Sequence, residues 1–349
     1  MTRSPVLAAL SIGAASVAPG RTCRAQANQP APAGAYHVVA RIPAGGEGGW
    51  DYLAVDTAAH RLYVSRATHV MVIDTDRDSV VGDIGDTPGV HGIAIADALG
   101  RGYISNGRDS SVTVFDLRTL APVARVRGTG RNPDAILYEP STRRVFTFNG
   151  GSGTVTAIDA ATNRIVGTVA LGGRPEFAQA DGTGRVFVNL EDKSEVVAFD
   201  ARALAVRSRH PLAPCEEPTG MALDPRAMRL YVGCANKRMA VVDARTGRVV
   251  RTVPAGGDID ATAFDPATGL AFASAGDGTL TVLSTAAGAP APTTVATGPR
   301  GKTMALDART HRVYVPVAQY GAAPAPTAEQ PRPRPAMVPG SFTVLVLER

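Results

Sequence analysis

Residues 218–253, PTGMALDPRAMRLYVGCANKRMAVVDARTGRVVRTV, contain four short apolar runs separated by polar turns. The first run ends at Asp224-Pro225, the second at residues 235–238, and the third at Arg245-Thr246-Gly247. Short apolar or β-branched runs bounded by Asp, Asn, Pro and Gly are typical of strands, and no run here is long enough for a helix. The stretch therefore predicts a four-stranded antiparallel unit.

The same unit recurs along the whole chain. Its register is marked by the position five residues before the acidic turn residue that ends each first strand. This position recurs every 41 to 43 residues, at Asp51, Gly92, Asp134, Glu176, Thr219, Asp260 and Lys302. A period of about 40 to 45 residues with four strands per repeat is typical of a β-propeller blade. We therefore predict an all-β fold, a seven-bladed β-propeller of four-stranded antiparallel blades.

The first and last repeats are incomplete in complementary ways. Residues 36–42 predict a single strand without a hairpin partner, and residues 342–348 match a third strand that no fourth strand follows. Pairing these two strands closes the ring and removes exposed sheet edges. We expect one propeller domain over residues 36–349, as a monomer, with a Pro-rich loop insertion at residues 318–340 in the last blade.

The N-terminal residues have the pattern of a targeting segment. Residues 1–27 combine Arg3, an apolar run over residues 6–18 and the small-residue pattern Ala25-Gln26-Ala27, which predicts a secretory signal peptide. Residues 28–35 are expected to be a flexible leader. No later stretch approaches eighteen apolar residues, so we expect no membrane span. The protein is expected to be periplasmic or secreted.

Two cysteines fall on one face of the fifth blade. Cys215 precedes its first strand and Cys234 ends its second strand. In an oxidising compartment we expect these two residues to form a disulfide bond.

Charge and motifs exclude several classes of function. The net charge of +5 falls to +2 without residues 1–27, which hold three arginines and no acidic residue, so no nucleic acid partner is expected. The chain has no nucleotide, haem or flavin motif. It also lacks the common hydrolase and metalloprotease signatures GxSxG and HExxH.

Four repeats contain variants of a YVTN tetrapeptide: LYVS at 62–65, VFVN at 186–189, LYVG at 230–233 and VYVP at 313–316. With phrases such as Trp50-Asp51-Tyr52-Leu53, these resemble exported bacterial members of the YncE-like family of YVTN-repeat β-propellers. The resemblance covers nearly all of the chain after the predicted signal peptide. It implies a seven-bladed propeller, usually in the periplasm or on the cell surface, and most members have no assigned reaction.

In a propeller, the fourth-to-first and second-to-third connections share one face, which we call the upper face. The register position of each blade should lie at the inner rim of this face, around the central channel. Chemically distinctive residues at or beside this position are the predicted ligand-binding residues: Trp50, Asp51, His91, Asp134, Glu176, Asp260 and Lys302. We call this set the channel-mouth residues.

Four carboxylates at one channel mouth would repel one another unless they are protonated, paired with Lys302 or bridged by a cation. Carboxylates with one imidazole suit a divalent ion such as Ca²⁺, Mn²⁺ or Zn²⁺. The candidate metal ligands are Asp51, His91, Asp134, Glu176 and Asp260. A polar channel filled with water is the alternative interpretation, and it stays open.

Two main functions are consistent with this sequence. The one we favour is a non-catalytic binding propeller that takes a small ligand, a metal ion or an envelope protein on its upper face. The alternative is a metal-dependent, lactonase-like hydrolase, or a lyase or isomerase, with His91, Glu176 or Lys302 as the acid or base. A third, an electron-transfer companion subunit, lacks a visible cofactor attachment.

Overall fold

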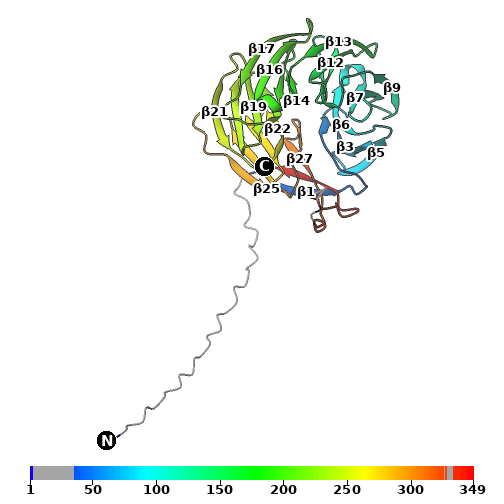
Figure 1. The fold of residues 1–349 in the computed structure, drawn as a ribbon. Coiled ribbons are helices and arrows are strands. Elements are labelled where there is room, and N and C mark those ends of the chain that lie inside the picture. The colour runs from blue at the N-terminus through cyan, green and yellow to red at the C-terminus, as the bar shows by residue number, and fades with distance from the viewer. Residues whose placement is uncertain (3–34, 326, 328–332) are drawn as a thin grey trace. The chain divides into compact units, whose positions relative to one another are not determined.

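The computed structural model describes residues 1–2, 35–325, 327 and 333–349. The predicted signal peptide and leader therefore lie outside the described residues, apart from residues 1–2 and 35. Residues Ala33–Arg349 form one compact unit. Within it, seven four-stranded antiparallel sheets follow one another around a ring (Figure 1), which confirms the predicted seven-bladed propeller.

Each blade runs from an inner to an outer strand in chain order, except the last, whose outer strand is β1. Blade one consists of β2 (Leu53–Asp56), β3 (Arg61–Arg66), β4 (His69–Asp74) and β5 (Ser79–Ile84), and blade two of β6 (Val90–Ala96), β7 (Arg101–Asn106), β8 (Ser111–Asp116) and β9 (Pro122–Arg127). Blade three consists of β10 (Pro133–Glu139), β11 (Arg144–Asn149), β12 (Thr154–Asp159) and β13 (Arg164–Ala170), and blade four of β14 (Pro175–Ala180), β15 (Arg185–Leu190), β16 (Glu195–Asp200) and β17 (Ala205–Pro211). Blade five consists of β18 (Pro218–Asp224), β19 (Arg229–Cys234), β20 (Arg238–Asp243) and β21 (Val249–Pro254), and blade six of β22 (Ile259–Asp265), β23 (Leu270–Ala275), β24 (Thr279–Ser284) and β25 (Thr293–Ala296). Blade seven consists of β26 (Ala305–Asp307), β27 (Arg312–Val317), β28 (Thr343–Glu348) and β1 (His37–Pro43).

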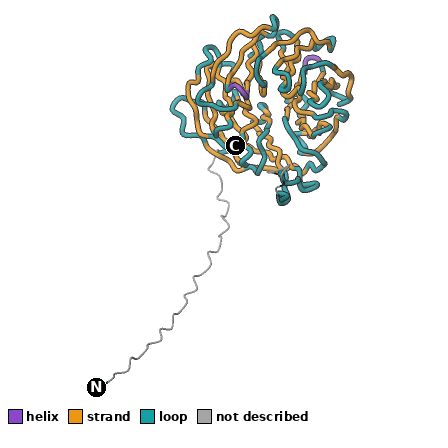
Figure 2. The backbone as a smooth tube through the Cα atoms, in the orientation of Figure 1, coloured by secondary structure: helices purple, strands orange, loops and turns teal. Residues whose placement is uncertain are grey.

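Loops and strands alternate around the whole ring (Figure 2). The helical segments of the described residues are two single 3₁₀ turns, η1 (Asp97–Leu99) and η2 (Glu191–Lys193). None of the helices in this part of the chain has the length and apolarity needed to cross a membrane.

The core lies between neighbouring blades. The middle strands of each blade are buried along nearly their whole length, as in β3 and β4, because both of their faces pack against another blade. One cluster, for example, joins Tyr63 and Val72 of blade one to Ile93 and Ile104 of blade two. The outer strands are more exposed: the residues of β17 alternate between exposed and partly buried, and β5 has one buried residue, Ile84. Burial on both faces explains why the second and third strands have continuous apolar runs.

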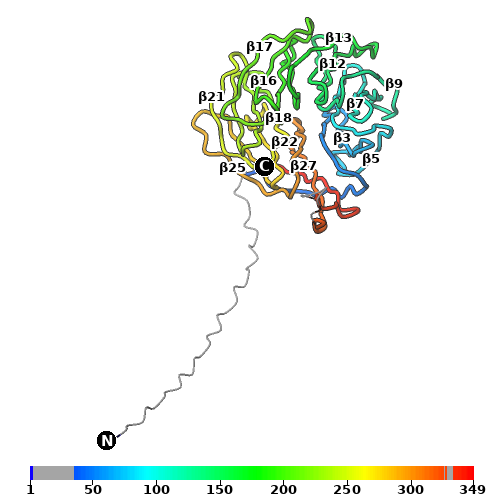
Figure 3. The backbone as a smooth tube through the Cα atoms, viewed as in Figure 1, coloured from blue at the N-terminus to red at the C-terminus, as the bar shows by residue number. Residues whose placement is uncertain are grey.

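The two ends of the propeller domain pair in one sheet. Strand β1 lies antiparallel to β28, from His37 opposite Glu348 to Pro43 opposite Thr343. Figure 3 shows the blue and red ends of the propeller side by side at this blade. The predicted closure is therefore confirmed, and the last blade contains strands from both ends of the domain.

A buried arginine ties the segment after β1 to the closing blade. Arg66 is fully buried, and its terminal nitrogens donate hydrogen bonds to the carbonyl oxygens of Gly45, Glu47 and Gly48 at 2.9 to 3.0 Å. Its guanidinium lies 3.8 Å from the ring centroid of Phe342, just before β28. The charge is thus matched by three carbonyl dipoles and an aromatic face, which offsets its desolvation. This contact holds the loop that leads to Trp50 and Asp51.

Two further features lie on the upper face. The expected disulfide links Cys215, before β18, to Cys234 at the end of β19. The Pro-rich connection of the last blade joins β27 to β28; its residues 326 and 328–332 lie outside the described residues, and in the described part an isolated bridge pairs Tyr320 with Met337.

Removing residues 1–43 should make the protein aggregate, because the open edge of β28 would be exposed along its whole length. The control is removal of residues 1–34, which keeps β1. Size-exclusion chromatography with light scattering measures the outcome. A protein without residues 1–43 that keeps the elution volume and melting temperature of the control would contradict this role of β1.

Candidate functional site

The channel-mouth residues of four blades lie in irregular parts of their inner strands. The pairing register with the second strand shifts between Val90 and Ile93, Pro133 and Ile136, Pro175 and Ala178, and Ile259 and Ala261. Such bulges leave residues unpaired and redirect their side chains. The residues enclosed by these shifts include His91, Asp134, Glu176 and Asp260. The bulges thus present them at the mouth of the channel.

Asp51 and Lys302 occupy the same repeat position as the three acidic residues above, but they lie just before their inner strands. Blade one begins its inner strand at Leu53 and blade seven at Ala305, so both residues lie in the preceding connections. The backbone N–H of Asp51 donates a 2.9 Å hydrogen bond to the Ser65 hydroxyl, which fixes the connection against β3.

Three side chains from blades one, two and three meet around one point. His91 Nδ1 lies 2.6 Å from Asp51 Oδ2 and 3.6 Å from Asp134 Oδ1. One potential ligand atom from each residue lies within 4.8 Å of the other two. We call Asp51, His91 and Asp134 the channel triad. One imidazole and two carboxylates at this spacing can hold either a proton or a single metal ion.

A second contact fixes the orientation of the His91 ring. The side chain of Asn132 forms a further hydrogen bond with the imidazole. Gly107 leaves the space for both groups, since a Cβ there would lie 2.6 Å from His91 Nε2 and 2.6 Å from Asn132 Oδ1. The ring is therefore held with Nδ1 toward the two carboxylates. Metal-binding histidines are commonly oriented in the same way, by a hydrogen bond from the ring nitrogen that does not bind the metal.

The charges of the channel triad are strongly coupled. Burial lowers the pKa of His91, but the Asp51 hydrogen bond and the charges of Asp134 and Asp51 outweigh it and raise the pKa to about 9. Burial raises the pKa of Asp134 to about 7, against the opposing charge of His91. At neutral pH the imidazole is therefore protonated between the two carboxyl groups.

Glu176 faces Tyr52 on the other side of the channel. The Tyr52 hydroxyl donates a 3.3 Å hydrogen bond to Glu176 Oε1. Burial, helped by the charges of Asp134 and Asp260, raises the pKa of Glu176 to about 9, so this carboxyl is protonated at neutral pH. The Tyr52 ring packs edge-on against Phe177, with centroids 5.3 Å apart. Tyr52 immediately precedes β2 of blade one and Phe177 lies in β14 of blade four, so this ring pair joins two blades that are not neighbours.

Asp260 and Lys302 neutralise each other, with Lys302 Nζ 2.8 Å from Asp260 Oδ2. Trp50 lies apart from the triad. Its ring packs against Phe342 at 5.2 Å and Tyr320 at 6.5 Å, beside the start of the Pro-rich connection.

The structure thus divides the channel-mouth residues into four parts: the channel triad, Glu176 with Tyr52, the Asp260–Lys302 ion pair, and Trp50. Sequence reasoning did not select Tyr52, Asn132 or Gly107 as site residues. The sequence marks Tyr52 and Asn132 only by their position beside predicted site residues, since Tyr52 follows Asp51 and Asn132 lies two residues before Asp134. Gly107 belongs to a second-to-third connection on the same face.

No protein-family model matches the chain. Two curated relatives are the proteins named "Uncharacterized protein YncE" of Salmonella typhi and Salmonella typhimurium. Each is 28% identical over 160 residues, a match that covers 43% of this chain and 44% of the relative. The match thus spans less than half the length of these relatives. Together with the seven-bladed architecture, it supports the YncE-like resemblance that the repeats indicate.

Among solved structures, the hydrazine synthase of Kuenenia stuttgartiensis aligns with a TM-score of 0.69 at 14% sequence identity. The alignment covers 76% of this chain and 92% of that one. Identity this low shows a shared fold alone.

Replacing Asp51 by Asn should lower the pKa of His91 from about 9 toward the ordinary value of about 6.5, because the strongest interaction that favours the protonated ring is lost. Since the folded pKa is raised, the pair stabilises the wild-type fold most below pH about 6.5. This stabilisation is lost as pH rises through about 9. NMR titration of the imidazole measures the shift. Asp86→Asn, at an exposed carboxylate, is the control, and an unchanged His91 titration in Asp51→Asn would refute the coupling.

Proposed function

We propose that this YncE-like propeller is an exported binding protein whose channel mouth takes one divalent cation on Asp51, His91 and Asp134. The observation that carries the proposal is the convergence of three ligand atoms, one from each of three blades, within 4.8 Å of one another. The cation would replace the proton on His91 Nδ1 and screen the two carboxylates from each other. The hydrogen bond from the imidazole to the Asn132 side chain supports this binding mode, since it leaves Nδ1 directed at the carboxylates.

The donor set favours Zn²⁺ or Mn²⁺ over Ca²⁺, because an imidazole nitrogen suits the transition metals while Ca²⁺ prefers oxygen ligands. Glu176 and Asp260, the other two candidate ligands, have their own partners in Tyr52 and Lys302. They would line the site around the ion. A small ligand with a donor atom of its own could complete the coordination sphere from the open upper face.

Export is supported by the Cys215–Cys234 bond, because disulfides persist in oxidising compartments. The signal-peptide pattern of residues 1–27 points the same way. These two features, together with the site, support the proposed periplasmic or secreted binding role.

Calorimetric titration with ZnCl₂, MnCl₂ and CaCl₂ tests the cation. We expect saturable binding of one Zn²⁺ or Mn²⁺ per chain and weaker binding of Ca²⁺. Asp134→Asn should abolish binding and leave the melting temperature unchanged or higher, because a buried carboxyl among like charges has been removed. Asn132→Ala should weaken binding by about 10- to 100-fold through loss of ring orientation.

The control is Asp86→Asn, a carboxylate on the same face whose side chain is 86% exposed and paired with Arg125. It should bind the metal as wild type does. Equal heats from wild type and Asp134→Asn, or none from either, would remove the cation from this proposal.

One observation favours the second candidate, a metal-dependent hydrolase of the lactonase type. A carboxyl that is protonated at neutral pH, as expected for Glu176, is suited to act as a general acid beside a metal site. Metal-loaded wild type should then hydrolyse lactones or esters, and Glu176→Gln should lose activity while it still binds the metal. If the protein binds the metal but hydrolyses neither lactones nor esters, the hydrolase function is contradicted and only the binding function remains.

A further inference from the structure

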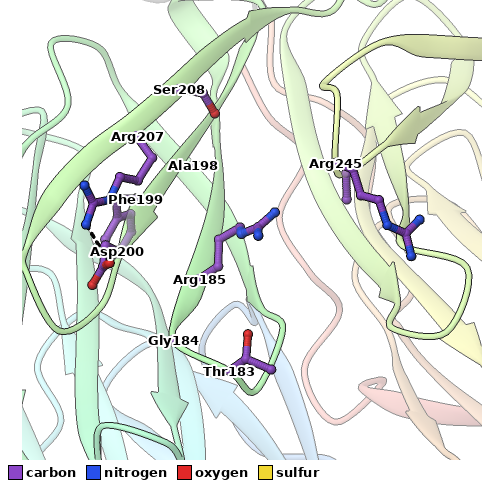
Figure 4. A pocket seen from close by; sticks show the side chains of 10 residues that line it. Thr183, Gly184, Arg185, Ala198, Phe199, Asp200, Arg207, Ser208 and Arg245 are labelled. Carbon is purple, nitrogen blue, oxygen red and sulfur yellow. Dashed lines mark hydrogen bonds and ion pairs between the residues drawn. The ribbon is translucent and has the colours of Figure 1, made fainter.

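A second candidate site lies between blades four and five, away from the channel. A cavity of about 340 Å³ is lined by the ends of β15 and β16, by β17 and by the turn after β20 (Figure 4). The first-to-second and third-to-fourth connections that border it belong to the face opposite the channel mouth. We call this cavity the arginine groove, after Arg185, Arg207 and Arg245 in its walls.

The charges of the arginine groove are unbalanced. Its lining contains three arginines and one carboxylate, Asp200. That carboxylate is already occupied, since Asp200 accepts hydrogen bonds from the backbone N–H groups of Arg202 and Ala203 and from Arg207 at 2.8 to 2.9 Å. The hydrogen bonds from Ala203 and Arg207 lower the pKa of Asp200 to about 2, so its charge persists at neutral pH. Asp200 therefore neutralises Arg207, Arg185 has a longer ion pair with Asp181, and Arg245 has no carboxylate partner among the described residues.

The remaining two guanidinium groups come from different blades. Arg185 of blade four points into the space between the blades, and Arg245 stands on the opposite wall, in blade five (Figure 4). The nearest carboxylate contact of Arg185 is 3.9 Å, from Nε to Asp181 Oδ2. Arg245 donates from Nη1 to the carbonyl oxygen of Ala227 at 3.0 Å, and it makes no ion pair with any carboxylate in the described part of the chain. Most of the donors of both groups are therefore available to a ligand.

We propose that the arginine groove binds a small dianionic oxyanion, a phosphate group or a dicarboxylate, between Arg185 and Arg245. A guanidinium presents paired N–H donors that match the oxygen spacing of phosphate and carboxylate groups. A negatively charged ligand would balance the excess positive charge of the lining, and Ser208 adds a hydroxyl to the same wall. The cavity volume lies at the lower end of the range for small-molecule sites, about 300 to 1,000 Å³.

This site is independent of the proposed cation site. The two sites open on opposite faces, share no residue and prefer ligands of opposite charge. A chain that binds no metal could therefore still bind the oxyanion, and the reverse also holds.

Calorimetric titration of the full chain with sodium phosphate, phenyl phosphate and disodium succinate, at constant ionic strength, tests the proposal. We expect saturable binding of one ligand per chain. Preference for the two phosphates over succinate would assign a phosphate group, and the reverse preference a dicarboxylate. Arg185→Gln and Arg245→Gln should each weaken binding by about tenfold or more, since each removes charge-assisted hydrogen bonds.

The matched control is Arg164→Gln, an exposed arginine at the start of β13, which should bind as wild type does. Thermal melting of every variant checks that it is folded, and Asp134→Asn should bind the oxyanion with unchanged affinity. Absence of saturable heat with all three probes would overturn the proposal. Equal affinity of wild type and the Arg185→Gln/Arg245→Gln double variant would also overturn it.

Discussion

The pairing of β1 with β28 is the constraint on which the rest of the structure depends. It joins the two ends of the propeller domain in one blade, so seven repeats of similar sequence form a closed ring with no free edge at the seam. Closure brings blade one beside blades two and seven at once. Asp51 can therefore meet His91 on one side while the loop before it is tied to Phe342 through Arg66. An open array of the same blades would not converge on one channel.

The carboxyl groups that meet at the channel mouth would repel one another if all were ionised, and three arrangements reduce this repulsion. Asp51 and Asp134 share a protonated His91, Asp260 pairs with Lys302, and Glu176 is held neutral beside the Tyr52 hydroxyl. Buried carboxylates without such partners would destabilise the fold. Of the three arrangements, only the channel triad brings three potential ligand atoms within 4.8 Å of one another in the described residues, so a metal ion could take the place of the proton that His91 shares with Asp51. This is the physical reason to place the cation there.

The two candidate sites lie on opposite faces of the propeller and differ in charge. The channel mouth gathers carboxylates at the starts of the inner strands, whereas the arginine groove lies between the outer parts of two neighbouring blades on the opposite face. Arg185 stands at the start of a second strand, where six of the seven blades have arginine, whereas the channel-mouth residues differ from blade to blade. A repeated scaffold of this kind leaves such positions free to vary, so related propellers need not share a ligand.

The fold class, the number of blades, the closing strand and the disulfide could all be predicted from the amino-acid sequence. Strand periodicity and the 41- to 43-residue repeat are properties of the sequence pattern, so they can be recognised before the three-dimensional structure is known. The repeat register also predicted a set of channel-mouth residues, and the structure brings Asp51, His91 and Asp134 of that set together. The tertiary structure alone decided how these residues pair, since bulges and ring geometry bring His91 to Asp51 and Asp134, and leave Trp50 against Phe342. It alone revealed Tyr52 and Asn132 as partners, and it alone formed the arginine groove. Arg185, Arg207 and Arg245 occupy no common position in the repeat, so only the packing of blade four against blade five brings them together.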